Sequence, residues 1–251
     1  MKKSLKIVIS AVLILVIAAG GYLVNMFGVL AKGNGSAYSL KNVPTVEGSA
    51  LSGKTGIFLG SSVTYGYGSL GVSFVDFLEK TDGIIAVKEA ASGTTLVDNG
   101  KNSYVARMKT INTDLKADFF MCQLSTNDAT KKLPLGKVSE SYNIADFDTS
   151  TVTGAAEYII AYAKSIWNCP VIFYTQAKYD SEAYGKMVNM IFALKEKWDI
   201  TVIDFWNDEQ INSITDAERN LYLIDDIHPT RAGYLEWWLP EMRRVLIETL
   251  D

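Results

Sequence analysis

The chain has 251 residues, of which 48% are hydrophobic and 21% are charged, and these values suit one globular domain with an N-terminal extension. Residues 1–32 hold four lysines and no acidic residue, which leaves 20 basic and 28 acidic residues in the remainder. A domain this acidic lacks the basic footprint of a nucleic-acid-binding protein, so we expect no nucleic-acid partner.

The N-terminus begins with lysines and continues as a long uncharged run. Residues 7–31 carry no charge, and about 20 apolar residues are enough to cross the hydrocarbon core of a bilayer. We therefore predict a membrane anchor or a signal segment over residues 1–31, and we favour the anchor, with Ala18-Ala19-Gly20 as the alternative cleavage site. The lysines should stay in the cytoplasm. The rest of the chain would then lie outside it, anchored to the cell membrane by a single pass or secreted after cleavage.

Residues 32–53 are rich in glycine, serine and asparagine and show no hydrophobic periodicity, so we predict a linker there. The globular domain is expected over residues 54–251. Two cysteines, Cys122 and Cys169, fall on strands that would separate them by about 15 Å, which is too far for a disulfide. Because the chain has one histidine and no Cys/His cluster, we expect no metal ion and no cofactor.

From residue 54 onward the pattern alternates between short strands and longer helices. Strands are predicted at 56–60, 84–90, 119–124, 171–175 and 201–204, and helices at 71–80, 103–115, 155–167, 181–198, 208–221 and 230–249. This alternation indicates an α/β fold with a parallel sheet covered on both faces. Runs such as 119–124 are almost continuously apolar, as strands buried on both faces should be.

The residues that follow each strand matter most, because ligand sites in open parallel sheets lie at the carboxyl ends of the strands. The first strand is followed by Ser61 and Ser62, the second by a turn with Gly93, and the third by Asn127. In a flavodoxin-like order of five strands, 2-1-3-4-5, these three strands are neighbours. We therefore expect their polar residues at one edge of the sheet, with a long loop over residues 131–150 beside them.

His228 is the only histidine, and it is the last residue of the stretch Asp225-Asp226-Ile227-His228. A carboxylate three residues before an imidazole can accept a hydrogen bond from its Nδ1–H, which leaves Nε2 free to take a proton. Asp225 is the favoured partner of the ring and Asp226 is the alternative.

Acyl transfer needs a hydroxyl nucleophile, a base and donors for the oxyanion, and this chain offers each of them. Ser62 can supply the hydroxyl and His228 the base. The backbone N–H of Ser62, the backbone N–H of Gly93 and the side-chain amide of Asn127 can serve as oxyanion donors.

These segments resemble the sequence blocks of the SGNH, or GDSL-type, hydrolases. Residues 60–64 (Gly-Ser-Ser-Val-Thr) resemble the GDSxT block, Gly93 matches the glycine of the second block, 125–128 (Ser-Thr-Asn-Asp) resemble GxND, and 225–228 resemble DxxH. The resemblance covers residues 54–251 and implies a three-layer α/β/α fold and serine ester hydrolysis without a metal. It implies the roles nucleophile for Ser62, base for His228, partner of the base for Asp225, and oxyanion donors for Ser62, Gly93 and Asn127.

Two residues depart from the pattern of that family. Ser61 stands in place of the aspartate of GDS, and Ser125 stands in place of the glycine of GxND. The family's aspartate is not a member of the triad, so Ser61 should not abolish the chemistry. We prefer Ser62 to Ser61 as the nucleophile because Thr64 then follows two residues later, as in GDSxT.

Two other classes of protein remain as alternatives. Residues 66–71 read Gly-Tyr-Gly-Ser-Leu-Gly, a GxGxxG pattern of dinucleotide-binding proteins, and Glu89 follows at a distance suited to a ribose-binding acid. That pattern should form the first turn after its strand, whereas this strand is predicted to end near Gly60. The second alternative is a non-catalytic module that binds glycan or lipid with the same fold.

The sequence therefore predicts a serine esterase that acts on a small ester outside the cytoplasm. An acyl group on a cell-surface carbohydrate is the first substrate class, and a lysophospholipid or another lipid ester is the alternative. The aromatic residues Tyr65, Tyr67, Trp206, Trp237 and Trp238 can line a sugar or acyl pocket, although packing of Trp237 and Trp238 under the last helix is the favoured interpretation.

Overall fold

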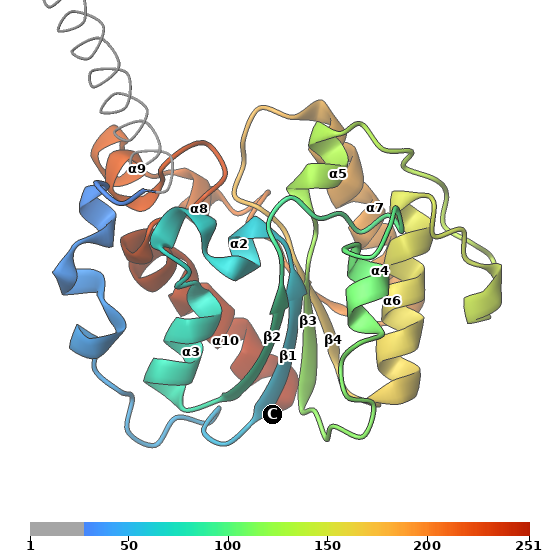
Figure 1. Cartoon of the computed structure of the whole chain (residues 1–251), viewed down its shortest axis with the longest axis horizontal. Helices are drawn as coiled ribbons and strands as arrows, with labels where there is room; N and C mark the ends of the chain where they lie inside the picture. Colours follow the sequence, from blue (N-terminus) through green and yellow to red (C-terminus); the bar gives the residue numbers. More distant parts are fainter. Residues whose placement is uncertain (1–27) are drawn as a thin grey trace, which may run out of the picture.

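A computed structural model describes residues 28–251 of the chain (Figure 1). The membrane anchor or signal segment predicted at residues 1–31 lies almost wholly outside the described residues. Between residues 28 and 251, no helix is both long enough and apolar enough to cross a bilayer.

A parallel sheet of five strands forms the centre of the fold, and its order is β2-β1-β3-β4-β5, which confirms the predicted order. The strands are β1 (Thr55–Gly60), β2 (Ile85–Ala90), β3 (Phe119–Gln123), β4 (Val171–Tyr174) and β5 (Thr201–Ile203). Gly60 pairs with Ala90, and Leu59 pairs with Cys122. The carboxyl ends of β2, β1 and β3 therefore meet at one edge of the sheet.

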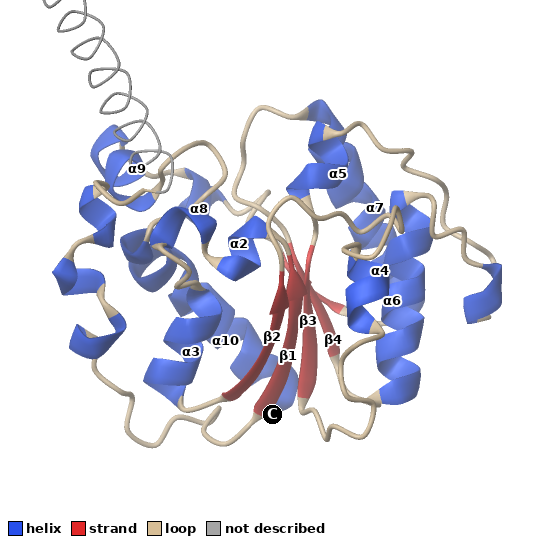
Figure 2. Ribbon diagram, in the orientation of Figure 1, coloured by secondary structure: helices blue, strands red, loops and turns tan. Residues whose placement is uncertain are grey.

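Helices cover both faces of the sheet and complete an α/β/α sandwich (Figure 2). One face carries α4 (Tyr104–Met108), α6 (Val152–Ile166) and α7 (Glu182–Trp198), and the other carries α3 (Phe74–Asp82), the π-helical segment η6 (Gly233–Trp238) and α10 (Leu239–Leu250). Successive strand residues point to opposite faces. In β1, Ile57 and Leu59 accordingly join the first apolar core, and Phe58 joins the second.

The helices differ from the prediction where caps or turns interrupt the apolar pattern. The helix predicted at 208–221 is two helices, α8 (Glu209–Asn212) and α9 (Asp216–Tyr222), because Thr215 and Glu218 form a capping box that starts a new helix. The helix predicted at 103–115 ends at Met108. Two short helices that follow strands were not predicted, α2 (Ser62–Tyr65) and α5 (Thr126–Thr130).

The segment predicted as a linker at 32–53 is folded over its first part. It forms three short 3-10 turns, η1 (Lys32–Asn34), η2 (Ser36–Tyr38) and η3 (Leu40–Asn42), and Gly33 and Asn34 are buried. Glycine is required at 33, because a Cβ there would lie 2.0 Å from the carbonyl oxygen of Leu221. The small residues that suggested a flexible linker therefore allow this segment to pack closely on the domain.

The loop predicted at 131–150 contacts the loop after β2 at both of its ends, because the backbone N–H of Asp98 donates to the carbonyl oxygen of Thr149 at 2.9 Å. Lys131 Nζ donates to the carbonyl oxygen of Gly93 at 2.9 Å. Farther along, Lys197 Nζ on α7 donates to the carbonyl oxygens of Ser139 and Ser141, each at 2.6 Å, and to the buried carboxylate of Glu157 on α6. The middle of this loop is therefore fastened to the helical layer.

Candidate active site

Ser62 lies at the point where β1 turns into the short helix α2. Gly60, the last residue of β1, has no room for a side chain, because a Cβ would lie 1.7 Å from Thr64 Oγ1. Helix α2 ends after one turn at Gly66, whose φ of 91° is in the left-handed region that glycine adopts readily. This tight strand–helix turn holds Ser62 at the N-terminus of α2, where backbone N–H groups have no acceptor within the helix.

The His228 side chain comes from a loop between α9 and η6. Asp225 Oδ1 accepts hydrogen bonds from the backbone N–H groups of Ile227 and His228, both at 2.8 Å, and so forms the turn. Its Oδ2 lies 2.8 Å from His228 Nδ1. On the other side of the ring, His228 Nε2 lies 2.8 Å from Ser62 Oγ. The structure thus brings Ser62, His228 and Asp225 into one hydrogen-bonded row.

The two alternatives that the sequence left open concern neighbouring residues of the same type. The carboxylate that contacts the imidazole belongs to Asp225, whereas Asp226 lines a small cavity with Lys178 and Arg219. The hydroxyl that contacts the imidazole belongs to Ser62. Ser61 is fully buried and its Oγ hydrogen bonds to Gln123 Oε1 at 3.2 Å.

The environment of Asp225 favours its ionised form. Partial burial raises the pKa of the carboxyl group. The hydrogen bond and charge of His228, with the backbone N–H groups of Ile227 and His228, lower it by more, so the pKa of Asp225 lies below its usual value. An ionised Asp225 keeps the proton of the neutral imidazole on Nδ1 and leaves the Nε2 lone pair toward Ser62.

Gly93 lies on the loop that follows β2, and Asn127 lies in the first turn of the short helix α5, which follows β3. Gly93 has a φ of 78°, is exposed, and has nothing within 4 Å of where a Cβ would be. Asn127 Nδ2 donates to the carbonyl oxygen of Thr94 at 3.0 Å, which ties the loop after β2 to α5. A side-chain amide has two N–H donors, so the second donor of Asn127 remains for a ligand.

Three buried polar residues that the sequence did not single out support these loops. The Asp128 carboxylate accepts from the backbone N–H groups of Leu96 at 2.8 Å and Val97 at 3.1 Å. Burial raises the pKa of Asp128, and these two donors oppose the rise. The sequence offered one sign of this supporting role, which is that Asp128 directly follows Asn127.

The other two supporting residues are Gln123 and Arg107. Gln123 Oε1 accepts hydrogen bonds from the backbone N–H of Ser61 at 2.8 Å and from Thr64 Oγ1 at 3.0 Å. The sign of this role in the sequence is that Gln123 is a polar residue at the end of an otherwise apolar strand. The buried guanidinium of Arg107 donates to the carbonyl oxygens of Gly60 at 2.7 Å and Glu89 at 2.9 Å. Nothing in the sequence around Arg107 marks this role.

The GxGxxG pattern at residues 66–71 does not form the first turn after β1, because helix α2 lies between them. Its middle glycine, Gly68, packs instead against the loop that carries His228, and a Cβ on Gly68 would lie 3.0 Å from the Cβ of His228. The aromatic residues Trp237 and Trp238 end η6, directly before α10, and are core residues, in agreement with the favoured interpretation.

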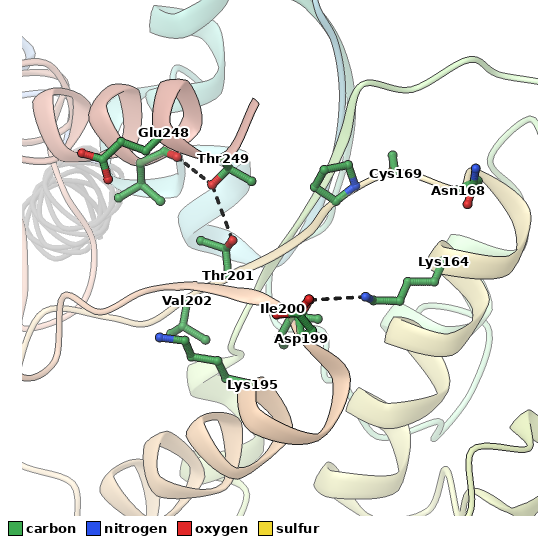
Figure 3. Close-up of a pocket in the computed structure, with 12 residues that line it drawn as sticks. Lys164, Asn168, Cys169, Lys195, Asp199, Ile200, Thr201, Val202, Glu248 and Thr249 are labelled. Carbon is green, nitrogen blue, oxygen red and sulfur yellow. Dashed lines mark hydrogen bonds between the residues drawn. The ribbon is translucent and has the colours of Figure 1, made fainter. Parts of the chain in front are cut away.

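One cavity lies at the amino ends of the strands, whereas Ser62 follows the carboxyl end of β1 (Figure 3). It measures about 760 Å³ and is lined at the amino ends of β4 and β5 by residues that include Cys169, Asp199 and Thr201. Cys169 and Cys122 are both buried free thiols. Among residues 28–251, no group of three or more His, Cys, Asp or Glu side chains is placed to hold a metal ion.

Comparison with known proteins connects this geometry to a family. Residues 57–238 match the family model described as GDSL-like lipase/acylhydrolase. A search of curated proteins gives no match.

Several solved structures share the fold. A protein from Lactobacillus plantarum is 22% identical with a TM-score of 0.64, over 80% of this chain and 97% of that one. A GDSL-like lipase from Bacteroides ovatus is 18% identical with a TM-score of 0.58, over 79% and 100%. A family two carbohydrate esterase from Clostridium thermocellum, in complex with cellohexaose, is 11% identical with a TM-score of 0.50, over 83% and 63%.

Proposed function

Because the chain belongs to the GDSL-like lipase/acylhydrolase family of the SGNH hydrolase superfamily, and is therefore a hydrolase of the esterase or lipase kind, we propose that it cleaves carboxylic esters with Ser62, His228 and Asp225. The observation that carries the proposal is the contact of 2.8 Å between His228 Nε2 and Ser62 Oγ. This is the distance at which an imidazole can remove the proton of a hydroxyl nucleophile.

The proposed reaction has two halves that share one base. Ser62 Oγ attacks the ester carbonyl while His228 Nε2 takes its proton, and Asp225 stabilises the imidazolium that forms. When the tetrahedral intermediate collapses, His228 gives this proton to the leaving alcohol, and the acyl group stays on Ser62. In the second half, His228 takes a proton from water as the water attacks the acyl-enzyme, and it gives this proton to Ser62 Oγ when the second tetrahedral intermediate collapses, which releases the carboxylic acid and restores the Ser62 hydroxyl and the neutral imidazole.

We assign the oxyanion to three donors around the end of β1. The N–H of Ser62 has no intrahelical acceptor at the start of α2. The exposed, side-chain-free turn at Gly93 allows its N–H to approach a substrate, and Asn127 has its second amide N–H. Donors of this kind hold charge that develops only in the transition state.

For the substrate we propose first a small acyl group on a carbohydrate outside the cytoplasm. The exposed turn at Gly93 leaves space for a bulky alcohol, and the fold is shared with a carbohydrate esterase that binds cellohexaose. A lipid ester is the second candidate, and it is favoured by the exposed apolar side chains of Tyr65, the last residue of α2, and Leu70, which follows that helix.

A pair of adjacent serine variants tests the nucleophile. We expect Ser62→Ala to lower kcat on a small p-nitrophenyl ester by at least about 10⁴-fold while the circular dichroism spectrum is retained. Ser61→Ala is the matched control and should keep kcat within about tenfold, because Ser61 faces Gln123 and not the imidazole. A folded Ser62→Ala protein that hydrolyses esters at the wild-type rate would refute this assignment.

A panel of esters tests the substrate class. It contains an acetylated oligosaccharide, a p-nitrophenyl ester of medium chain length and a lysophospholipid. We expect kcat/KM to be at least about tenfold higher on the acetylated sugar, which corresponds to about 1.4 kcal/mol of transition-state stabilisation. A preference of that size for the lysophospholipid would replace the carbohydrate proposal with the lipid one.

A further inference from the structure

The segment that precedes the family-matched region lies against the loops that carry the candidate catalytic residues. In Figure 1 the first of the N-terminal turns, η1, drawn in blue, lies beside α9. The family match begins at residue 57, whereas η1 covers Lys32–Asn34. This contact therefore belongs to a part of the chain outside the matched domain.

Asn34 makes the central hydrogen bonds of this contact. Its side chain is buried, at 7% exposed. Nδ2 donates to the carbonyl oxygens of Gly28 at 2.7 Å and Gly68 at 2.8 Å, and Oδ1 accepts from the backbone N–H of Arg231 at 2.9 Å. Both amide protons and one carbonyl lone pair are thereby used, so the orientation of the amide is fixed.

The two partners of Asn34 inside the domain lie close to the candidate catalytic residues in sequence and in space. Gly68 follows the helix that begins with Ser62, and Arg231 follows His228 by three residues. A Cβ on Gly68 would lie 2.8 Å from the carbonyl oxygen of Pro229 and 3.0 Å from the Cβ of His228. The backbone at Gly68 is thus the surface on which the His228 loop rests.

A second set of contacts keeps the same three segments together. Thr230 Oγ1 donates to the carbonyl oxygen of Leu221 at 2.7 Å, and Gly33 packs against both of those residues without space for a Cβ. Arg231 Nε donates to the carbonyl oxygen of Ser69 at 3.3 Å. Well-packed, fully hydrogen-bonded junctions of this kind resist displacement, because a shift leaves buried polar groups unpaired.

We propose that Asn34 is a positioning residue, which sets the spacing between the Ser62 and His228 loops from outside the family-matched domain. The inference rests on the proposed function. The contact between Ser62 and His228 joins two separate loops, and misplacement of reacting groups by about 1 Å can cost about 100-fold in rate. Without the Asn34 amide, the His228 loop loses its hydrogen-bonded bridge to the carbonyl oxygen of Gly68 and retains the weaker bond from Arg231 to Ser69 and the direct packing on Gly68.

The test uses the full chain with Asn34→Ala, Asn34→Asp and a matched control, Asn42→Ala. Asn42 lies on the same N-terminal segment, and its Nδ2 donates to the carbonyl oxygen of Ser36 at 2.7 Å, away from both loops. Asn34→Asp retains an acceptor for Arg231 but cannot donate to Gly68. It also serves as the second variant should the alanine variant fail to fold.

We expect both Asn34 variants to lower kcat by about 10- to 100-fold with KM changed by less than about threefold. The rate of labelling by a small fluorophosphonate should fall in parallel, and Asn42→Ala should change neither. Melting temperatures are measured so that every rate is compared where the proteins are folded, since a purely structural role would lower Tm and leave the kcat of the folded protein unchanged.

Folded Asn34 variants with the kcat of Asn42→Ala would overturn this inference alone. If instead the wild-type chain hydrolyses no ester of the panel and no fluorophosphonate labels it, the proposed function fails and the inference fails with it.

Discussion

Asp225 has two tasks within one turn of the chain. Oδ1 of its carboxylate closes the turn by accepting hydrogen bonds from the N–H groups of Ile227 and His228, and both oxygens lie within hydrogen-bond distance of His228 Nδ1, with Oδ2 the nearer. The residue that shapes the loop is therefore the one that orients the ring. The turn at Ser62 also has two tasks. It positions the Ser62 hydroxyl, and it leaves the N-terminal N–H groups of α2 without an acceptor inside the helix.

Asp225→Asn tests the carboxylate at the residue scale. We expect kcat to fall by about 10³- to 10⁴-fold, because an amide neither stabilises the imidazolium nor maintains the tautomer that leaves Nε2 unprotonated. Asp226→Asn is the matched control and should keep the wild-type kcat. Equal losses in the two variants, measured on the same ester, would contradict the assignment of Asp225.

Asn127→Ala tests the amide donor. We expect kcat to fall by about 10²- to 10³-fold with little change in KM, because the lost hydrogen bond forms fully only in the transition state. Steady-state kinetics on a p-nitrophenyl ester measure both constants. An increase in KM with unchanged kcat would instead make Asn127 a substrate-binding residue.

At the scale of elements, the candidate site depends on keeping the carboxyl ends of β1 and β2 together. Arg107 on α4 does this from the side, by donating to the carbonyl oxygens of Gly60 and Glu89. A further hydrogen bond, to Thr94 Oγ1 at 3.1 Å, reaches the loop that carries Gly93. One buried guanidinium thus links the nucleophile turn, an edge strand and a loop of the candidate oxyanion site.

Arg107→Met is expected to lower the free energy of unfolding by about 3 kcal/mol, because it leaves buried carbonyl groups without donors. The matched control is Arg244→Met. The side chain of Arg244 is 54% exposed where that of Arg107 is 8% exposed, and the ion pairs of Arg244 with Glu241 and Glu248 lie on the surface. Its loss should cost less than about 1 kcal/mol. Denaturant unfolding of both variants measures the difference, and similar losses would contradict the role given to Arg107.

The strands and their order could be predicted because buried parallel strands are short, apolar and separated by helices. The capping box at Thr215 and Glu218 was also readable, and it explains why the helix predicted at 208–221 divides. The role of Asn34 could not be predicted. Its partners are backbone atoms of Gly68 and Arg231, and no pattern of residue types records a contact with the backbone.

For the whole molecule, the N-terminal turns change how the domain is attached to what precedes it. The sequence predicted a linker of about twenty residues, whereas the chain is already packed on the domain at Gly28, next to Gly68. Leu30, at 71% exposed, lies on the same stretch. If residues 1–31 include the proposed anchor, the edge of the sheet with Ser62 and His228 would lie near the membrane surface.

Fractionation of cells that express the full chain tests that proposal. We expect the protein in the membrane fraction. High salt should not release it, because an apolar segment of about 20 residues inserts into the bilayer and does not depend on surface charge, whereas detergent should release it. Intact mass then distinguishes anchor from signal segment. Soluble protein that has lost its first residues near Ala19 would contradict the anchor.

The most direct measurement for the central claim is the site of fluorophosphonate attachment, mapped by peptide mass spectrometry in wild type and His228→Gln. We expect the phosphonyl group on Ser62 of the wild-type chain, with the labelling rate at least about 10³-fold lower in the variant, because the reagent reports a serine activated by its base. Attachment at Ser61, or undiminished labelling without the imidazole, would contradict the claim that Ser62 and His228 act together.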